Sequence, residues 1–396
     1  MPVLVQKFGG SSLATEERRR LAARRVVKAV EQGYQVAVVV SALGRRGDPY
    51  ATDTLLDLIK PVNGLSARDV DLLLSCGEVI AAVVVAATLQ RAGLPAVPLT
   101  GWQAGIITDQ EHGEARILEI RPRRILEHLR AGRVAVVAGF QGISPAGEIT
   151  TLGRGGSDTT AAALGVALQA EAVEIYTDVN GIKTADPSLV PSAKTLKRLT
   201  YREVCEMAHL GAKVIHPRAV EIAMAGSVPL WVRSTFEEEE GTEISVQVAG
   251  DRLVTGIAHS KGLAQVKVRS EEDLNEEGRA LQALEALAQR GISLDMIHLS
   301  PEVLCFVVPE ERLDEAAAAL EEQGLAVETR RSLAKVSAVG AGMRGIPGVM
   351  ARVVRALSAE GIPIFQTSDS HANISCLVWE RDLARAVQAL HTAFAL

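Results

Sequence analysis

The sequence predicts an α/β protein, with a parallel sheet covered by helices, followed by a duplicated α+β module. In the N-terminal half, short apolar runs alternate with longer amphipathic segments, as expected of strands joined by crossover helices. Aromatic residues make up only 3% of the 396 residues, so Ala, Val, Leu and Ile must build the core. Beyond about residue 260 the sequence repeats itself at a constant offset. This length favours two or three domains.

The N-terminal half predicts a strand over residues 3–8 and a charged helix over about 15–32. Further strands are expected over 36–40, 134–137 and 172–176. Small and polar residues follow directly after the strands, at 9–12, 41, 139–142 and 177–178. Because parallel strands end at one edge of a sheet, and ligands bind outside that edge, these positions predict a ligand site.

A glycine-rich segment over 151–160, Thr-Leu-Gly-Arg-Gly-Gly-Ser-Asp-Thr-Thr, runs into an Ala-rich stretch that predicts a helix. The glycines let the backbone approach a ligand, and free N–H groups of a first helical turn attract anions. Residues 157–160 are candidates for the N-cap, and Arg154 can grip a carboxylate with two hydrogen bonds. The spacing matches neither the dinucleotide fingerprint nor the phosphate loop, so a turn that only redirects the chain remains the alternative.

The C-terminal half contains an internal repeat. A strand over 230–233 and an acidic turn over 237–242 precede it. Leu-Ala-Gln-Val at 263–266 then recurs as Leu-Ala-Lys-Val at 333–336, 70 residues later. Each copy predicts strand, helix, Gly-Ile, strand, strand and helix, an α+β sandwich with two helices on one sheet face. The repeat is either a duplicated structural module or a pair of regulatory domains that binds a small effector.

Composition narrows the class of protein. A net charge of −6 without a long basic tract argues against a nucleic-acid surface. The cysteines lack metal-type spacing and suit a reducing compartment, so we expect structural roles for Cys76, Cys205, Cys305 and Cys376. The longest apolar run, 79–89, is short for a bilayer, and the N-terminus lacks the regions of a signal peptide. We expect a cytoplasmic protein with no membrane partner.

Eight short motifs occur in the order seen in aspartate kinases, and the chain resembles that family over essentially its whole length. They are Lys7-Phe8-Gly9-Gly10-Ser11-Ser12, Val40-Ser41-Ala42, Ser75-Cys76-Gly77-Glu78, Gly139-Phe140-Gln141-Gly142, Leu152 to Thr160, Tyr176-Thr177-Asp178-Val179-Asn180-Gly181, Thr184-Ala185-Asp186-Pro187 and Gly211-Ala212-Lys213-Val214-Ile215-His216-Pro217. The resemblance implies an amino-acid kinase domain with a parallel-sheet sandwich over 1–240, a linker over 241–260, and two ferredoxin-like ACT domains over 261–330 and 331–396.

The resemblance implies ATP-dependent phosphorylation of the L-aspartate side-chain carboxylate to 4-phospho-L-aspartate. This reaction opens lysine (diaminopimelate), threonine and methionine biosynthesis, and the ACT domains imply feedback regulation. A carboxylate is already ionised at neutral pH, so no general base is needed. Catalysis must come from holding two anions together and neutralising charge, with ATP and Mg²⁺ as cofactors.

Three charged residues are similar to the family's catalytic groups. Lys7 and Lys213 match the lysines that neutralise the transferring phosphoryl group. Surface lysines, at a strand end or on a helix, are the alternatives. Asp158 is expected to orient these lysines or to hold magnesium through water, and the sequence does not separate the two roles.

By resemblance, the aspartate pocket reads a zwitterion. Arg154 would grip the α-carboxylate and Glu78 would pair with the α-ammonium, although Glu78 could instead be a carboxylate at a helix N-terminus. Ser41 and Thr52 are similar to hydroxyl positions that line the pocket. The substrate-binding loop itself is completed by Gly155, Gly156 and Ser157.

The resemblance also assigns a nucleotide site. Its expected members are Lys7, Gly9, Gly10, Ser11, Thr177, Asp178, Lys183, Asp186, Lys213 and Val214. Many members of the family carry Tyr where this chain has Lys183, and Arg where it has Ser188. Lys183 is therefore a candidate to restore the missing positive charge.

The insertion-like Asp369-Ser370-His371, together with Gly44-Arg45-Arg46-Gly47-Asp48-Pro49-Tyr50 in the N-terminal half, resembles the diaminopimelate-responsive subgroup more than the lysine- and threonine-inhibited enzymes. The candidate effector-binding residues of the repeat are Met343, Gln366, Asp369, His371 and Asn373. Diaminopimelate, lysine or threonine are the candidate effectors, and unregulated activity stays possible. No methionine occurs between Met224 and Met296, which argues against an internally started subunit and favours a homo-oligomer associated through ACT domains.

Two alternatives to an aspartate kinase stay open. The first is another member of the group, such as a glutamate 5-kinase or an acetylglutamate kinase, although those lack the paired C-terminal repeat. The second is a non-catalytic amino-acid sensor that uses the kinase body as a scaffold.

Overall fold

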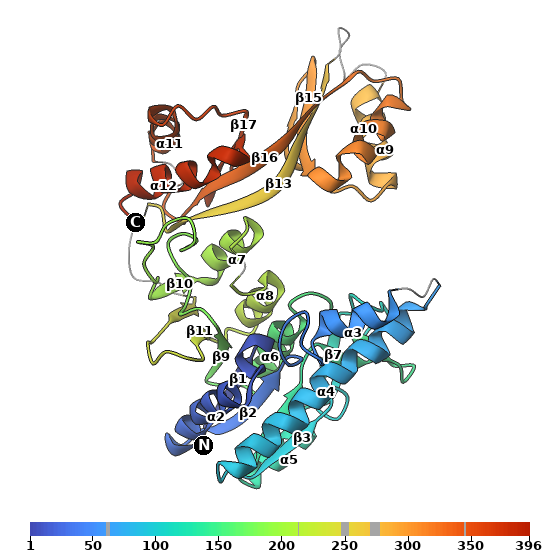
Figure 1. Cartoon of the computed structure of the whole chain (residues 1–396), viewed down its shortest axis with the longest axis vertical. Coiled ribbons are helices and arrows are strands. Elements are labelled where there is room, and N and C mark those ends of the chain that lie inside the picture. Colours follow the sequence, from blue (N-terminus) through green and yellow to red (C-terminus); the bar gives the residue numbers. More distant parts are fainter. Residues whose placement is uncertain (61–63, 213, 247–252, 270–277, 344–345) are drawn as a thin grey trace. The chain divides into compact units, whose positions relative to one another are not determined.

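The structure is a computed structural model and describes residues 1–60, 64–212, 214–246, 253–269, 278–343 and 346–396 (Figure 1). The described residues form two compact units. The first comprises the described residues within Met1–Ile182, Thr195–Ala208 and Lys213–Ala249, and the second those within Lys183–Lys194, His209–Ala212 and Gly250–Leu396.

An eight-stranded sheet forms the centre of the first unit, in the order β10-β12-β11-β9-β1-β2-β6-β3. Neighbouring strands are parallel except β11 and β12. The strands are β1 (Val3–Phe8), β2 (Gln35–Val40), β3 (Ala96–Leu99), β6 (Val134–Ala138), β9 (Ala172–Thr177), β10 (Arg198–Thr200), β11 (Leu230–Ser234) and β12 (Thr242–Ser245). The parallel sheet is confirmed, and each strand expected in this unit lies within one residue of its expected bounds.

Both faces of this sheet are covered, because alternate residues of its inner strands are apolar and buried on both sides. Val36, Val38 and Val40 of β2 pack in one core with α2 (Glu16–Glu31) and α4 (Ala67–Arg91). The intervening Ala37 and Val39 are also fully buried and face the layer of α5 (Arg123–Arg130) and α6 (Gly156–Ala167). The unit also contains α1 (Gly10–Leu13), α3 (Thr52–Ile59), α7 (Tyr201–His209) and α8 (Pro217–Ala225).

Helix α4 is long and apolar enough to cross a membrane, judged by length and composition alone. Its residues Ala81, Val85 and Leu89 are buried against the sheet. Burial of this kind is typical of a core helix in a globular protein.

A second, four-stranded sheet of the first unit has the order β5-β4-β7-β8. Its strands are β4 (Ile106–Thr108), β5 (Ile117–Ile120), β7 (Gln141–Ile143) and β8 (Ile149–Thr151). The hairpin of β7 and β8 carries the chain from the end of β6 to the glycine-rich segment. This small sheet therefore sets where that segment begins.

The second unit contains the two copies of the repeat in one antiparallel six-stranded sheet, in the order β14-β15-β13-β16-β18-β17. Its strands are β13 (Gly256–Arg269), β14 (Asp295–Leu299), β15 (Val303–Pro309), β16 (Val327–Val339), β17 (Gln366–Asp369) and β18 (Asn373–Trp379), and its helices are α9 (Arg279–Gln289), α10 (Leu313–Glu321), α11 (Val349–Ala359) and α12 (Leu383–Ala393). The expected strand-helix-strand-strand-helix order is confirmed in each copy.

The long central strands β13 and β16 each serve both copies. The equivalent residues Leu263 and Leu333 pair directly, so the copies are related by an approximate twofold axis at this point. Residues 183–194 join the core of the second copy, where Ala185 and Val190 are buried. The backbone N–H of Ile257 donates to the carbonyl of Thr184 at 2.7 Å and ties this segment to β13.

Candidate active site

The backbone after β1 lies between the ends of its two neighbours, β9 and β2. The N–H of Gly9 donates to the carbonyl of Tyr176 at 3.3 Å, and the N–H of Gly44 donates to the carbonyl of Gly10 at 3.0 Å. A Cβ on Gly10 would lie 2.5 Å from the carbonyl oxygens of Ala42 and Gly44, so only glycine fits there. Tightly packed backbone therefore forms the edge of the sheet at which a ligand site was predicted.

The glycine-rich segment opens α6, as predicted, but its N-cap is Gly155 and not a hydroxyl or carboxylate side chain. Gly155 has a φ of 70°, a left-handed conformation that a glycine adopts without strain. The prediction of an N-cap within residues 157–160 is wrong, because the turn that starts the helix comes earlier. Thr159 and Thr160 instead donate their hydroxyls to the carbonyls of Gly155 and Gly156.

A pocket of about 710 Å³ lies beside this loop. Nine predicted site residues line it: Lys7, Ser41, Thr52, Glu78, Arg154, Gly155, Gly156, Ser157 and Asp158. They come from β1, the segment after β2, α3, α4 and the start of α6. The structure therefore brings together every residue predicted to bind the substrate.

Sequence reasoning missed several residues of the pocket wall. They include Asp53, Asp71, Gly113 and Glu114. Asp71 precedes Glu78 on α4 by seven residues, which is two helical turns and therefore the same face. From this spacing, the sequence could have indicated that Asp71 lies on the same side of the helix as Glu78 and therefore near the pocket.

Lys7 and Asp158 form an ion pair inside the pocket, with Nζ and Oδ1 2.7 Å apart. Their side chains are only 12% and 13% exposed. The ammonium is held in place from the first turn of α6, at the edge where Gly9 and Gly10 approach. This geometry supports an orienting role for Asp158 toward Lys7.

Glu78 is a buried carboxylate of the pocket wall. It lies in the middle of α4, so the alternative that it is a helix N-terminal carboxylate is wrong. Oε1 accepts the N–H of Ala42 at 3.0 Å, whereas Oε2 has no hydrogen-bond partner among the described residues. Burial raises the pKa of this carboxyl to about 8, against the lowering effect of the Ala42 N–H.

This raised pKa predicts a pH dependence of substrate binding. Because the pKa is raised on folding, the neutral form of Glu78 contributes to the stability of the folded protein at low pH. This contribution to stability is lost as the pH rises through about 8. The resemblance to aspartate kinases implies that Glu78 binds the ammonium of aspartate, which needs the ionised carboxylate, so the KM for aspartate is expected to rise about tenfold per pH unit as the pH falls from 8 to 6. KM measured at saturating ATP checks this. Glu78→Gln should show a high and pH-independent KM, and a flat wild-type profile would contradict the assignment.

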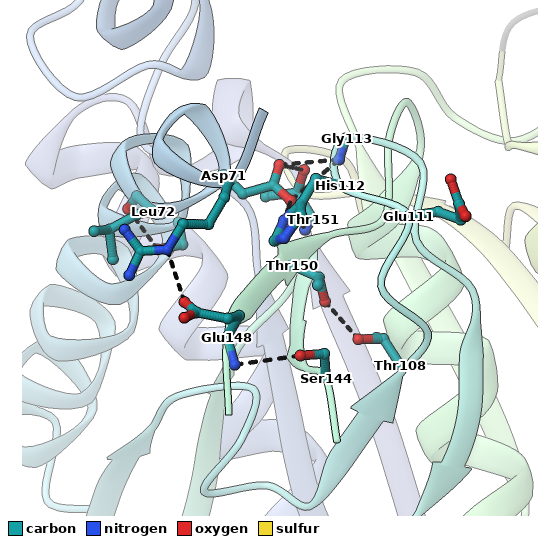
Figure 2. A network of polar contacts seen from close by, with 12 residues as sticks. Asp71, Leu72, Thr108, Glu111, His112, Gly113, Ser144, Glu148, Thr150 and Thr151 are labelled. Atoms are coloured by element: carbon teal, nitrogen blue, oxygen red, sulfur yellow. Dashed lines mark hydrogen bonds and ion pairs between the residues drawn. The ribbon is translucent and has the colours of Figure 1, made fainter. Parts of the chain in front are cut away.

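Asp71 is the centre of a polar network that joins α4 to the small sheet (Figure 2). Its carboxylate accepts the N–H of Thr151 at 3.0 Å and the N–H of Gly113 at 3.1 Å. The Thr151 hydroxyl donates to Oδ1, and Nδ1 of His112 donates to Oδ2 at 2.8 Å. Beside this network, Arg68 donates to Glu148 at 2.9 Å on the exposed surface.

Other predicted residues lie outside this pocket. Gly9, Gly10, Ser11, Thr177, Asp178 and Val214 belong to the first unit but do not line it. Asp178 is paired with Arg45 from the segment after β2. Lys183 and Asp186 belong to the second unit, and Lys213 lies outside the described residues. Their roles in ATP binding stay predictions.

The predicted effector residues are spread over the second copy of the repeat. Met343 is buried in its core, Gln366 and Asp369 lie on β17, and His371 and Asn373 follow. A pocket of about 430 Å³ in this unit is lined by Gln366 but by none of the other four. Gln366 accepts a hydrogen bond from Gln265 at 2.9 Å across the sheet.

Comparison with known protein families matches two segments of the chain to two different family models. Residues 2–234 match the family model described as amino acid kinase family, and residues 328–392 match a model of an ACT domain. The first match covers more than half of the chain, in the part that forms the pocket. The chain belongs to the amino acid kinase family.

Individual relatives narrow this class. Aspartokinase 1 of Bacillus subtilis is 46% identical over all of both chains, and the aspartokinase of Geobacillus stearothermophilus is 44% identical over all of this chain and 98% of its own. The crystal structure of Escherichia coli aspartokinase III with aspartate and ADP is 26% identical, with a TM-score of 0.81 over all of both chains. Within the amino acid kinases, this chain is a member of the aspartokinases.

Proposed function

We propose that this chain transfers the γ-phosphoryl group of ATP to the side-chain carboxylate of L-aspartate. One observation carries the proposal: a single pocket combines the buried carboxylate of Glu78, the guanidinium of Arg154 and the ammonium of Lys7. The first two complement the opposite charges of an amino-acid zwitterion. The third supplies positive charge for the acceptor carboxylate and the incoming phosphoryl group.

The proposed reaction needs no proton transfer, because the acceptor oxygen is already anionic. Glu78 binds the α-ammonium and Arg154 the α-carboxylate, which directs the side chain of aspartate toward Lys7. The close backbone of Gly9 and Gly10 approaches the phosphates of ATP. Positioning and charge neutralisation then lower the barrier. The E. coli aspartokinase III complex with aspartate and ADP supports this substrate pair.

We propose that magnesium binds here mainly through the substrate phosphates and water, with little contribution from protein ligands. The described residues hold no group of three or more His, Cys, Asp and Glu side chains suited to a metal. Mg²⁺ commonly binds through substrate phosphates, waters and one or two carboxylates. Asp158 is the carboxylate that we propose to reach its water shell, and the bound ion would neutralise phosphate charge.

A hydroxamate-trapping assay tests the substrate. With ATP and Mg²⁺, we expect turnover of L-aspartate and little of L-glutamate or N-acetyl-L-glutamate. The acetylated substrate has no ammonium for Glu78, so its rejection follows from the pocket. Preferential phosphorylation of glutamate would overturn the proposal, and no turnover of any of the three would favour a non-catalytic sensor.

We also infer that the second unit regulates the first, as its ACT match suggests. Lysine accompanies aspartate in a T-state structure of E. coli aspartokinase III, which is 26% identical with a TM-score of 0.79. Diaminopimelate, lysine or threonine would act through different affinities for two conformations. Assays with each amino acid singly and in pairs measure this, and an unchanged rate and thermal midpoint would make the repeat structural.

The remaining assignments belong to the same proposal. The kinase domain would end near residue 240, and the two ACT domains would follow a linker over 241–260. This linker would contain β12 and the start of β13. Association through the ACT domains would give a homo-oligomer. The product would enter lysine, threonine and methionine biosynthesis in the cytoplasm.

A further inference from the structure

Asp71 is a buried carboxylate of the pocket wall that has no part in the reaction above. Only 1% of its surface is exposed. Its two oxygens accept hydrogen bonds from a threonine hydroxyl, two backbone N–H groups and an imidazole. A buried carboxylate with this many donors is fixed in one orientation.

The donors come from two chain segments that pair with each other. One is the loop over 112–115, and the other is the end of β8 at Thr151 and Leu152. The N–H of Ala115 donates to the carbonyl of Thr151 at 2.9 Å. Glu114 lies so close to Gly153 that a Cβ there would be 2.4 Å from its Oε2. Together, these two segments form the stem of the glycine loop.

A guanidinium holds the same stem by its carbonyls. Arg218, in the first turn of α8, donates from Nη1 to the carbonyl of Leu152 at 3.2 Å and from Nη2 to the carbonyl of Ala115 at 2.9 Å. Asp71 accepts from backbone N–H groups one or two residues earlier in both segments. The carboxylate and the guanidinium thus bind complementary backbone groups of the stem.

The stem leads directly to Arg154, three residues after Thr151. Asp71 and Glu78 lie two turns apart on the same face of α4. Asp71 therefore joins the helix that carries Glu78 to the loop that carries Arg154, the two charged residues proposed to bind the amino-acid substrate. The spacing of these charges must match the fixed distance between the ammonium and carboxylate of a zwitterion.

We propose that Asp71 and Arg218 are positioning residues that set the distance between Arg154 and Glu78 and so determine the affinity for the amino-acid substrate. This inference rests on the proposed function, since it concerns how that pocket is held. It predicts a loss of substrate affinity without an equal loss of nucleotide affinity. A purely structural role would weaken both or lower stability alone.

The test compares Asp71→Asn with Glu148→Gln in the full chain. Asparagine has the same shape, but the N–H of Gly113 lies 3.1 Å from both carboxylate oxygens, so in either orientation the NH₂ group faces this donor and the network is weakened. Glu148 pairs with Arg68 and so also joins α4 to the β7–β8 hairpin, but on the exposed surface away from the pocket. We expect Asp71→Asn to raise the aspartate KM about tenfold or more, with the ATP KM within about twofold, and Glu148→Gln to change neither.

A second pair keeps the test decisive if Asp71→Asn does not fold. Thr151→Val removes the hydroxyl donor to Asp71, whereas Thr151→Ser retains it. The valine variant should raise the aspartate KM severalfold and the serine variant should restore it. Equal increases in both KM values, an unchanged aspartate KM, or the same effect from Glu148→Gln would overturn the inference.

Failure of the proposed function is seen separately, in the wild-type protein. If wild type phosphorylates glutamate and not aspartate, the proposed substrate is wrong, and the Asp71 and Thr151 variants are then measured with glutamate. If wild type turns over neither, the shift in thermal midpoint by added aspartate replaces KM. Loss of that shift in Asp71→Asn, but not in Glu148→Gln, would support the positioning role, and its retention would overturn it.

Discussion

Replacement of Lys7 by methionine is expected to lower kcat about 10²- to 10³-fold, with the aspartate KM within about threefold. Methionine keeps the unbranched apolar stem of the side chain and removes the ammonium group. One fixed cation aimed at charge that develops in the transition state contributes about this much in other enzymes. Steady-state rates at saturating aspartate and ATP measure the effect.

The pairing of Lys7 with Asp158 requires a control, because Lys7→Met leaves a largely buried carboxylate without its partner. In the double variant Lys7→Met/Asp158→Asn, no unpaired charge remains. Its thermal midpoint should recover toward wild type, while its kcat should stay low. Recovery of kcat together with stability would show that Lys7 acts only by neutralising Asp158.

Replacement of Arg154 by alanine is expected to raise the aspartate KM about 10²-fold, with the ATP KM nearly unchanged. A bidentate guanidinium–carboxylate contact contains two charge-assisted hydrogen bonds, each worth about 1.5–3 kcal/mol. Arg154 is exposed, so solvent screens the contact and the lower part of that range applies. KM for each substrate, with the other saturating, measures the effect.

Two variants control for charge and for general damage. Arg154→Lys keeps the charge but not the planar pair of donors, so its aspartate KM should lie between wild type and Arg154→Ala. Arg124→Ala removes an exposed arginine of α5 that does not line the pocket and should leave both KM values unchanged. An unchanged aspartate KM in Arg154→Ala would refute the clamp.

The strands of the catalytic sheet could be predicted because they depend on short apolar runs. The run 36–40 is apolar at every position, as expected of a strand buried on both faces, and β2 is buried from Val36 to Val40. The prediction of the α6 N-cap was wrong because it relied on side-chain preference alone. Side-chain preference favours Ser157 or Asp158, but the left-handed turn at Gly155 starts the helix earlier.

The site was predicted where its residues lie close to glycines or strand ends, as Lys7, Ser41 and Arg154 do. Asp71 was missed because its neighbours in sequence are ordinary helix residues. Its role depends on Gly113 and Thr151, which are 42 and 80 residues away in the chain. No local pattern contains that information.

The local conformations and the kinds of charge could thus be predicted from the sequence: the covered parallel sheet, the glycine loop that opens a helix, the doubled module, and the carboxylate, guanidinium and ammonium groups. These depend on residues near one another in the chain. The environment of those groups, in contrast, depends on contacts between segments that are distant in the chain. Helix α4 packs against the backbone at Ala42 and against the end of β8, and both carboxylates are therefore removed from water. Burial raises the pKa of Glu78, which accepts the N–H of Ala42. Asp71 is held in one orientation because it accepts backbone N–H groups from distant segments, such as that of Thr151.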